Sequence, residues 1–293
     1  MAGLSEAEKR FLRGGVAGAL RADGRGRLQF RPVSVDTGVV PQAHGSALLR
    51  LGATKVIATV KMFLAELAYK AELGKPSVLH PDKGKVSISV DCSPTASPSF
   101  EGRGSEELST ELSFALERCL MGVKSGAGAA IDLSSLVIVA GKVCWDLYID
   151  GLAVSSDGNL LDALAAAVKA ALSDTCIPKV NVSLSAATDG EPEVDVSDEE
   201  FLQLDTSFVP VIVTLTKVGE HYIVDATSEE ESQMSSAVSV SVNKHGQLCG
   251  LTKRGGTGLD PSVVSDVLSV AKVASQQFIS LLDSEVASAE DAQ

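Results

Sequence analysis

Residues 143–172 read VCWDLYIDGLAVSSDGNLLDALAAAVKAAL, and this stretch decides the fold. Its second half predicts a helix over residues 160–172, because apolar side chains recur at helical spacing along one stripe: Leu161, Leu164, Val168 and Leu172. The many alanines between them suit close packing against a sheet. Its first half belongs to an apolar segment, Leu136–Val154, whose interruption near Gly141 indicates a pair of strands. We therefore expect a sheet with a helix packed on it.

Further segments have helical spacing on either side of this stretch. Residues 105–121 predict a helix with Ser105 as its N-cap, Asp260-Pro261 begins another that runs through Phe278, and residues 5–20 predict a fourth. Strands are predicted for the remaining apolar segments, which are the single strand Lys85–Asp91 and the hairpins Ser46–Lys61, Val211–Thr227 and Ala237–Leu251. This order of elements indicates an α+β fold with mixed, largely antiparallel sheets and packed helices.

An acidic segment, Asp189–Glu200, divides the chain. Its sequence, DGEPEVDVSDEE, shows no helix or strand periodicity and predicts a solvated loop between two lobes. We place the first lobe over residues 30–175 and the second over residues 200–280, after an N-terminal arm over residues 1–29. Residues 283–293 are small, polar and acidic, and they predict a flexible tail.

The composition excludes several classes of protein. The 293 residues include 25 Lys and Arg against 38 Asp and Glu, a formal net charge of −13, so contact with a nucleic acid needs a local basic patch. No apolar run reaches the roughly 18 residues of a membrane helix, and the first residues do not have the pattern of a signal peptide. The five cysteines are dispersed without a CxxC pair, which indicates reduced thiols in an intracellular protein.

One local feature stands out against this acidic background. Basic residues cluster near the N-terminus: Lys9, Arg10, Arg13, Arg21, Arg25, Arg27 and Arg31. Two interpretations stay open for this cluster. It is either a salt-bridged arm that docks onto an acidic surface, or an arm whose guanidinium groups bind phosphates.

Common catalytic signatures are absent from the sequence. The four histidines are too far apart along the chain for a metal cluster; they are His44, His80, His221 and His245. The Gly-rich segments at 126–130 and 255–258 match neither a P-loop nor a dinucleotide-binding pattern. We therefore predict neither a metal site nor a cofactor.

Several short motifs, in their order along the chain, resemble the ribonuclease PH family. They are Arg21–Arg25 (RADGR), Gly45–Ala47, Leu51–Val56, Val90–Ser93, Phe100–Gly104, Ser156–Asn159, Val209–Val211 and Val224–Thr227. The resemblance implies a two-lobed α+β fold. Active members of that family are phosphate-dependent 3′→5′ exoribonucleases that assemble as rings around a central RNA channel.

Two departures from the family pattern argue against catalysis. Asn159 and Leu160 follow Gly158 where the family has a Ser/Thr-Arg pair that binds phosphate at a helix start. Phe208 stands where active relatives have an aspartate, and a phenyl ring can neither exchange a proton nor bind a metal. Asp205 is close in sequence, but a shift along a strand can turn a side chain to the opposite face.

The resemblance is strongest to the branch that supplies non-catalytic ring subunits of the RNA exosome, through Phe100–Gly104 and Cys144–Asp150. It implies a structural and RNA-guiding subunit that is not itself an enzyme and that supports 3′→5′ RNA processing and degradation, including rRNA maturation and mRNA turnover. The implied partners are other ribonuclease PH-like exosome subunits in a hetero-hexameric ring, RNA-binding cap subunits, and RNA in the central channel. The implied locations are the nucleus, the nucleolus and the cytoplasm.

The RNA-binding residues implied by this resemblance are Arg103 and Arg118, because arginines near this helix contact the RNA backbone in archaeal relatives. A salt bridge, either to Glu106 or Glu107 or to a neighbouring subunit, is the alternative for each arginine. Such contacts would position RNA without reading its sequence.

Two other functions also stay open. The chain could be an active phosphorolytic ribonuclease that uses Asp205 or Asp225 as its acid. It could instead be a scaffold that binds proteins only and never contacts RNA.

Overall fold

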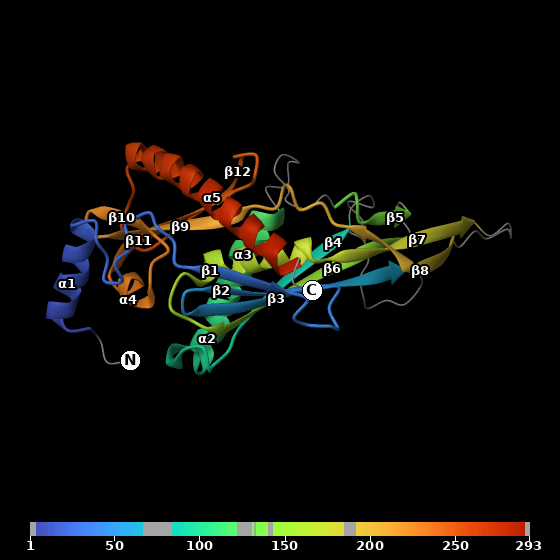
Figure 1. Ribbon diagram of the computed structural model, residues 1–293, viewed down its shortest axis with the longest axis horizontal. Coiled ribbons are helices and arrows are strands. Elements are labelled where there is room, and N and C mark those ends of the chain that lie inside the picture. The colour runs from blue at the N-terminus through green and yellow to red at the C-terminus, as the bar shows by residue number, and fades with distance from the viewer. Residues whose placement is uncertain are drawn as a thin grey trace.

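The computed structural model describes residues 4–66, 84–121, 131, 133–139, 143–184 and 192–290 of the chain (Figure 1). Its helices are α1 (Glu6–Ala17), α2 (Arg103–Met121), α3 (Leu160–Ser173), α4 (Ser228–Glu231) and α5 (Pro261–Glu290). Its strands are β1 (Val33–Thr37), β2 (Gly45–Leu51), β3 (Thr54–Glu66), β4 (Lys85–Cys92), β5 (Val137–Val139), β6 (Val143–Ser155), β7 (Cys176–Leu184), β8 (Pro192–Gln203), β9 (Val211–Val218), β10 (His221–Val224), β11 (Met234–Val242) and β12 (Leu248–Arg254). A short 3₁₀ turn, η1 (Pro98–Phe100), precedes α2.

The first sheet has the strand order β1-β2-β3-β6-β4, with β5 paired to β6. Only the pairing of β4 with β6 is parallel among the pairs described for this sheet. β2 and β3 form a hairpin through Gly52, whose φ of +58° is a left-handed conformation that glycine adopts without strain. Alternate residues of β2, namely Ala47, Leu49 and Leu51, are buried, so one face of this hairpin contributes to the core.

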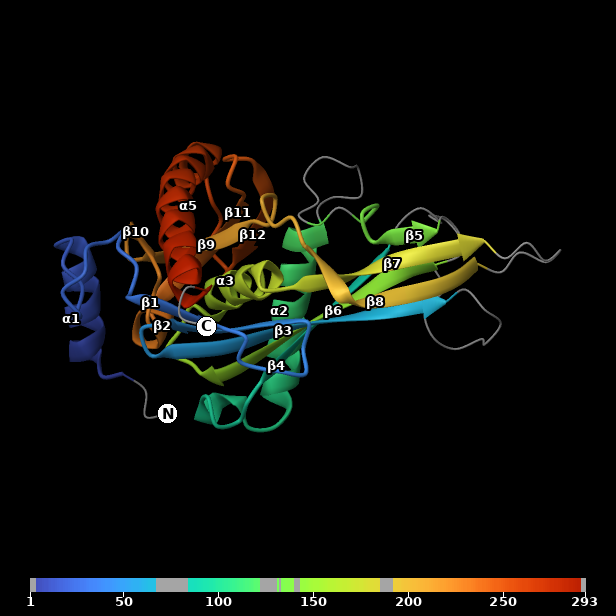
Figure 2. The ribbon, with the colours of Figure 1, turned by 45° about the vertical axis from the view of Figure 1, so that its right-hand side comes forward.

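The second sheet is antiparallel and has the order β10-β9-β11-β12. Helix α3 lies between the two sheets, in contact with β2 and β3 on one side and with β9 on the other. Every residue from Leu161 to Leu172 is buried, which is why the helix is apolar on nearly all sides, with Asp162 and Lys169 as the two charged residues in this stretch. Figure 2 shows this central helix below α5, and α1 at the end of the molecule away from the long strands.

Helix α5 ties the two sheets together. Phe278 belongs to the core beside the first sheet and stacks on Phe30, with 4.6 Å between ring centroids. Val267 and Ala271 belong to the core beside the second sheet. In the described parts of the chain, no helix is both long and apolar enough to cross a membrane.

The sequence predicted the fold class correctly. The four predicted helices correspond to α1, α2, α3 and α5, and the predicted hairpins correspond to β2–β3, β5–β6, β9–β10 and β11–β12. The predicted single strand corresponds to β4. The division into lobes at 30–175 and 200–280 stays a prediction, with the first sheet formed within the former range and the second within the latter.

The predicted loop over Asp189–Glu200 was wrong from residue 192 onward, and residues 189–191 lie outside the described residues. Strand β8 covers residues 192–203 and pairs with β7, a strand that the sequence analysis did not predict. The reason is visible in the sequence, since Val194 and Val196 alternate with acidic residues at the period of a strand with one polar face. The two strands form a separate ribbon that projects with β3 and β6 away from the helices (Figures 1 and 2).

Two predicted helix ends were also wrong. Ser105 is not an N-cap, because α2 begins at Arg103 and the Ser105 hydroxyl donates a hydrogen bond to the carbonyl of Gly102 at 3.1 Å. The predicted flexible tail is helical as far as Glu290, because α5 continues and keeps Leu282 buried at its inner face. The last three residues, 291–293, lie outside the described residues.

One carboxyl group is buried at the contact between α3 and β9. Asp162 has no exposed surface, and its two oxygens accept hydrogen bonds from Thr214, from the backbone N–H at 2.8 Å and from the hydroxyl at 2.6 Å. Burial raises the pKa of Asp162 to about 7, although the hydrogen bonds of Thr214 oppose this rise.

Asp162 predicts a pH dependence of stability. Its pKa is higher in the folded state than the ordinary value of 3.8, so the folded protein retains a proton that the unfolded chain releases. The contribution of Asp162 to the free energy of unfolding is therefore full below about pH 4 and declines as the pH rises to about 7, by at most ~1.4 kcal/mol per pH unit. In Asp162→Asn this decline disappears, since an amide stands in for the protonated carboxyl. Urea denaturation of both proteins across this pH range measures the difference, and parallel pH profiles would contradict it.

Candidate functional site

The carboxylate of Asp225 is the centre of a buried ionic network. Arg31 donates to it from its backbone N–H, Nε and Nη2, at 2.8, 2.9 and 2.7 Å. Arg25 donates from Nη1 at 2.9 Å, and Asn159 donates from Nδ2 at 3.0 Å. Burial raises the pKa of Asp225, but the hydrogen bonds and charge of Arg31 outweigh it and hold the pKa below its usual value. Asp225 is therefore a fixed carboxylate anion.

The turn before α3 is held against this network. Gly158 has φ +76°, and a side chain on it would collide with the backbone of Ala226 and Ser228, 2.7 Å from the position of a Cβ. Thr54 binds both sides of the turn, since its hydroxyl donates to the carbonyl of Gly158 at 2.9 Å and accepts from the N–H of Asp157 at 3.0 Å. Only glycine satisfies both the conformation and the close approach at this position.

Glu231 lies at the start of α3, where the family binds phosphate. Its Oε1 accepts a hydrogen bond from the backbone N–H of Asn159 at 2.9 Å. Asn159 adopts a left-handed conformation, and its side chain is turned to Asp225. The next residue, Leu160, packs partly against the core. The N-terminal end of α3, which favours an anion, is thus next to a carboxylate that the chain itself supplies.

Carboxyl groups match the positive charges around this helix start. Burial raises the pKa of Glu231, and the nearby N–H of Asn159 and the charges of Arg254 and Arg31 oppose that rise. Three guanidinium groups meet four carboxyl groups in this region: Arg25, Arg31 and Arg254, with Asp23, Asp157, Asp225 and Glu231. Little positive charge is left over to attract a phosphate dianion.

The N-terminal basic residues mainly serve the structure. Arg21 forms a buried bidentate ion pair with Glu230, and Arg25 and Arg31 pair with Asp225, which supports the salt-bridged interpretation for these three. Arg27 donates to the carbonyls of Val16 and Ala17 at the end of α1, at 2.7 and 2.6 Å. Lys9 pairs with Glu6 in its own helix, and Arg13 donates to Gln233.

The two arginines predicted to bind RNA lie on α2. Arg103 is its first residue, and Arg118 is fifteen residues further on, so their backbone positions are about 22 Å apart along the axis and within about 60° around it. Arg118 is exposed, and no ion pair joins it to a carboxylate in the described parts of the chain. The side chain of Arg103 lies outside what the structure describes. Their contact with RNA stays a prediction.

The two aspartates considered as catalytic acids, Asp205 and Asp225, lie in different surroundings. Asp205 lines a cavity beside the second half of α3, together with Lys169, which is ten residues or about 15 Å along the helix from Asn159. Its carboxylate accepts the N–H of Ser207 at 2.9 Å, which lowers its pKa. Asp225 is fully buried in ion pairs. Phe208 is exposed and packs on His245, with 5.1 Å between ring centroids.

Sequence reasoning did not identify Glu231 or Asp162. The sequence around Glu231 did contain a signal for a helix start, because Thr227 and Glu230 form a capping box. This capping box begins α4 and fixes the position of Glu231, the next residue. Asp162 had none, since an aspartate in an alanine-rich helix can equally face solvent. Within the described ranges, no group of three or more His, Cys, Asp and Glu residues is arranged to hold a metal ion.

Sequence profiles match two parts of this chain. Domain 1 of the 3′ exoribonuclease family matches residues 29–178, and domain 2 matches residues 209–274. The chain belongs to the 3′ exoribonuclease family. This assignment confirms the resemblance to ribonuclease PH, and the two-domain match agrees with the α+β fold described above.

Individual relatives in the 3′ exoribonuclease family are similar over most of the chain. The putative exosome complex exonuclease RRP42 of Dictyostelium discoideum is 33% identical, with 96% of this chain and 97% of that protein covered. The exosome complex component Rrp42 of Methanopyrus kandleri is 36% identical, with 83% and 85% covered. A chain of the Archaeoglobus fulgidus exosome, solved with RNA bound to the active site, has a TM-score of 0.72 and 32% identity, with 94% of this chain and 99% of that chain covered.

The Asp225 network predicts that removal of its central charge causes a large loss of stability. Asp225→Asn removes the buried carboxylate that Arg25 and Arg31 share and leaves them only the partly exposed carboxylates of Asp23 and Asp157, and we expect the free energy of unfolding to fall by ~3–5 kcal/mol. The matched control is Asp36→Asn, which breaks an exposed ion pair with Arg50 and should cost no more than ~1 kcal/mol. Urea denaturation compares the two, and equal losses would show that the network is not what holds this region.

Proposed function

We propose that this chain is a non-catalytic ring subunit of an RNA exosome. Membership of the 3′ exoribonuclease family and the Rrp42 relatives, named as exosome components, support its place in the ring. The similarity to a chain of an archaeal exosome over 94% of this chain supports the same architecture. By this analogy its neighbours are other ribonuclease PH-like subunits in a hetero-hexameric ring, with RNA-binding cap subunits above them and RNA in the channel.

The proposal that the subunit is not catalytic rests on one observation, the hydrogen bond from the backbone N–H of Asn159 to Glu231. It brings a carboxylate to the helix start that binds phosphate in active members. Leu160 supplies no guanidinium there, and Arg31 is already committed to Asp225 and Asp157. An attacking phosphate therefore lacks both a vacant position and a counter-charge. The subunit contributes walls and contacts to the particle, and the hydrolytic or phosphorolytic chemistry belongs to other subunits.

The five cysteines are all free thiols in the structure, which supports residence in a reducing compartment. We therefore expect the subunit in the nucleus, nucleolus and cytoplasm, where RNA is processed and degraded. The proposed role as a ring subunit does not involve a cofactor.

Catalytic silence is tested with the purified chain, RNA with a free 3′ end, and inorganic phosphate. We expect no release of nucleoside diphosphates, while an active member of the family run in parallel releases them. Phosphate-dependent release that Asp205→Asn abolishes would overturn the proposal. Asp205 is the suitable variant because its side chain lies outside the Asp225 network, so a loss of activity would not reflect unfolding.

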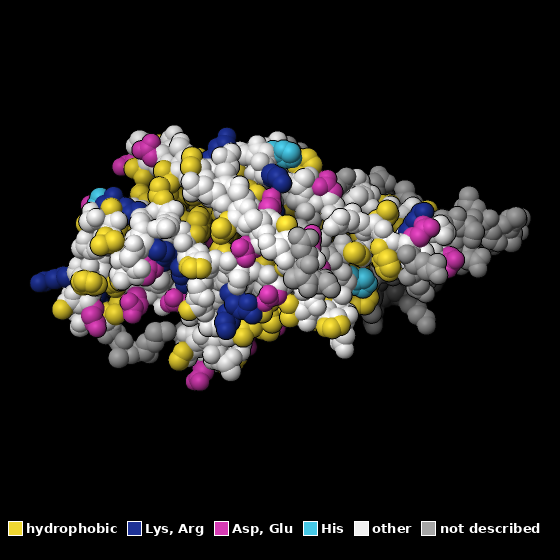
Figure 3. Space-filling model, in the orientation of Figure 1, with side chains coloured by type: hydrophobic (Ala, Val, Ile, Leu, Met, Phe, Trp, Pro, Cys, Tyr) yellow, Lys and Arg dark blue, Asp and Glu magenta, His cyan; other side chains and the backbone are white. Residues whose placement is uncertain are grey.

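The exposed face of α2 is the surface that would contact and guide RNA. Over the face drawn in Figure 3, the described Lys and Arg side chains occur in small groups beside Asp and Glu rather than as one continuous basic surface. An RNA path on this acidic protein therefore depends on a few arginines, of which Arg118 is exposed and has no described ion pair. Phosphate contacts of this kind orient RNA and do not select its sequence.

Arg118→Ala, assembled into the particle, should reduce RNA crosslinking to this subunit and lower the salt dependence of RNA binding by about one phosphate contact. The matched control is Arg50→Ala, an exposed arginine on β2 that is paired with Asp36. Unchanged crosslinking in Arg118→Ala, with the particle intact, would leave the scaffold function as the better account.

A further inference from the structure

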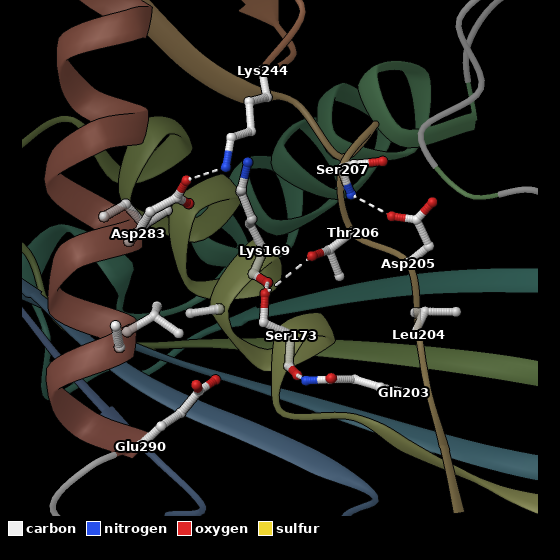
Figure 4. Close-up of a pocket in the computed structure, with 14 residues that line it drawn as sticks. Lys169, Ser173, Gln203, Leu204, Asp205, Thr206, Ser207, Lys244, Asp283 and Glu290 are labelled. Atoms are coloured by element: carbon white, nitrogen blue, oxygen red, sulfur yellow. Dashed lines mark hydrogen bonds and ion pairs between the residues drawn. The ribbon is translucent and has the colours of Figure 1, made fainter.

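The cavity that Asp205 and Lys169 line is separate from the start of α3. It has a volume of about 560 Å³ and lies between the second half of α3, the segment at residues 203–207 and the end of α5 (Figure 4). Lys244, from the turn between β11 and β12, closes one end of it. The proposed function makes no use of this cavity.

Lys169 is the unusual residue of the cavity. Its side chain comes from the apolar helix α3 and is only 4% exposed, yet its one described hydrogen bond is to a neutral acceptor, the carbonyl of Val209 at 3.1 Å. No carboxylate in the described parts of the chain lies within ion-pair distance of its Nζ. Burial lowers the pKa of Lys169, the charge of Lys244 lowers it further, and Asp283 partly opposes both. A buried ammonium group without a counter-ion is costly in free energy.

Lys244 brings a second ammonium group to the same end of the cavity. Figure 4 shows the amino groups of Lys169 and Lys244 converging, with Asp283 beside Lys244 at 3.0 Å. The Lys244–Asp283 pair is largely exposed, so it contributes little stability and can rearrange. Two ammonium groups and one carboxylate meet at this end of the cavity. The other two carboxylates of the lining, Asp205 and Glu290, lie on the segment at residues 203–207 and at the end of α5, so the positive charge is confined to this end.

The other residues that line the cavity limit the kinds of ligand that fit it. Leu282, Val286 and Ala287 form an aliphatic wall on α5, Leu204 lies across the cavity on the segment at residues 203–207, and Ser173 and Thr206 supply hydroxyl groups. Among the described residues, the lining includes no aromatic side chain on which a nucleobase could stack and no arginine that could hold a phosphate in two-point contact. Asp205 and Glu290 at the rim disfavour a dianion. A monoanion with an aliphatic body matches these features.

We propose that this cavity binds an aliphatic carboxylate, with the ammonium groups of Lys169 and Lys244 facing the carboxylate and the α5 wall covering the aliphatic part. The same chemistry is offered by a free short-chain carboxylate and by the C-terminal residue of a polypeptide. In either case the ligand supplies the counter-ion that Lys169 lacks.

Isothermal titration calorimetry of the full chain tests the proposal with hexanoate and with a tetrapeptide that ends in leucine. Each acid should bind at one site and at least about tenfold more tightly than its neutral counterpart, hexanamide or the C-terminally amidated peptide, because the charge-assisted contact is absent from the amides. Tighter binding of the peptide identifies a polypeptide end as the ligand, and tighter binding of hexanoate identifies a free carboxylate.

Lys169→Met and Lys244→Met should each weaken hexanoate binding by about tenfold. Lys244 is exposed, so its variant decides the question if Lys169→Met does not fold. The matched control is Lys179→Met, which removes an exposed lysine paired with Glu200 on the β7–β8 ribbon and should leave binding unchanged. The proposal fails if neither acid binds, if the amides bind equally well, if both lysine variants bind like the parent, or if inorganic phosphate binds more tightly than the carboxylates.

Discussion

The ion pairs of Asp225 are the constraint on which the rest of the structure depends. A carboxylate without exposed surface is stable only when donors surround it, and here Arg25, Arg31 and Asn159 do so. These partners come from the segment after α1 and from the start of α3, so one buried charge connects the N-terminal arm, the first sheet and the second sheet. Asp225 itself has φ +50°, an uncommon conformation for this residue type that the surrounding hydrogen bonds maintain.

The same network gives the start of α3 a structural role. Arg31 and Asn159 are turned to Asp225, and Glu231 accepts the N–H that would otherwise face an incoming anion. The favourable electrostatics of a helix N-terminus are still used, but an internal carboxylate uses them. The proposed lack of catalysis then requires little change of fold. Under that proposal, Asn159 and Leu160 replace the phosphate-binding side chains, and Glu231 of α4 lies beside the helix start.

Much of the fold could be predicted because its elements have regular patterns. The alternation in β4 and the apolar stripe of α3 each follow one periodicity, and the Gly52 turn and Asp260-Pro261 mark element ends by their restricted backbone conformations. β8 was missed because a high density of carboxylates concealed a two-residue period. That Asn159 and Leu160 differ from the Ser/Thr-Arg pair of the family could be seen in the sequence. The partners of Asp225 and the contact between Glu231 and Asn159 could not be predicted, because these hydrogen bonds join residues that are 66 to 200 positions apart in the chain.

The central claim is that this chain completes a ring of related but different subunits and does not work alone. Native mass spectrometry of the particle purified from its own cells tests this claim most directly. The account predicts a hetero-oligomer that contains one copy of this chain among other ribonuclease PH-like subunits. A homo-oligomer made only of this chain would contradict it, because such a particle would have to supply every catalytic group from a sequence in which Glu231, Leu160 and Phe208 stand at the decisive positions.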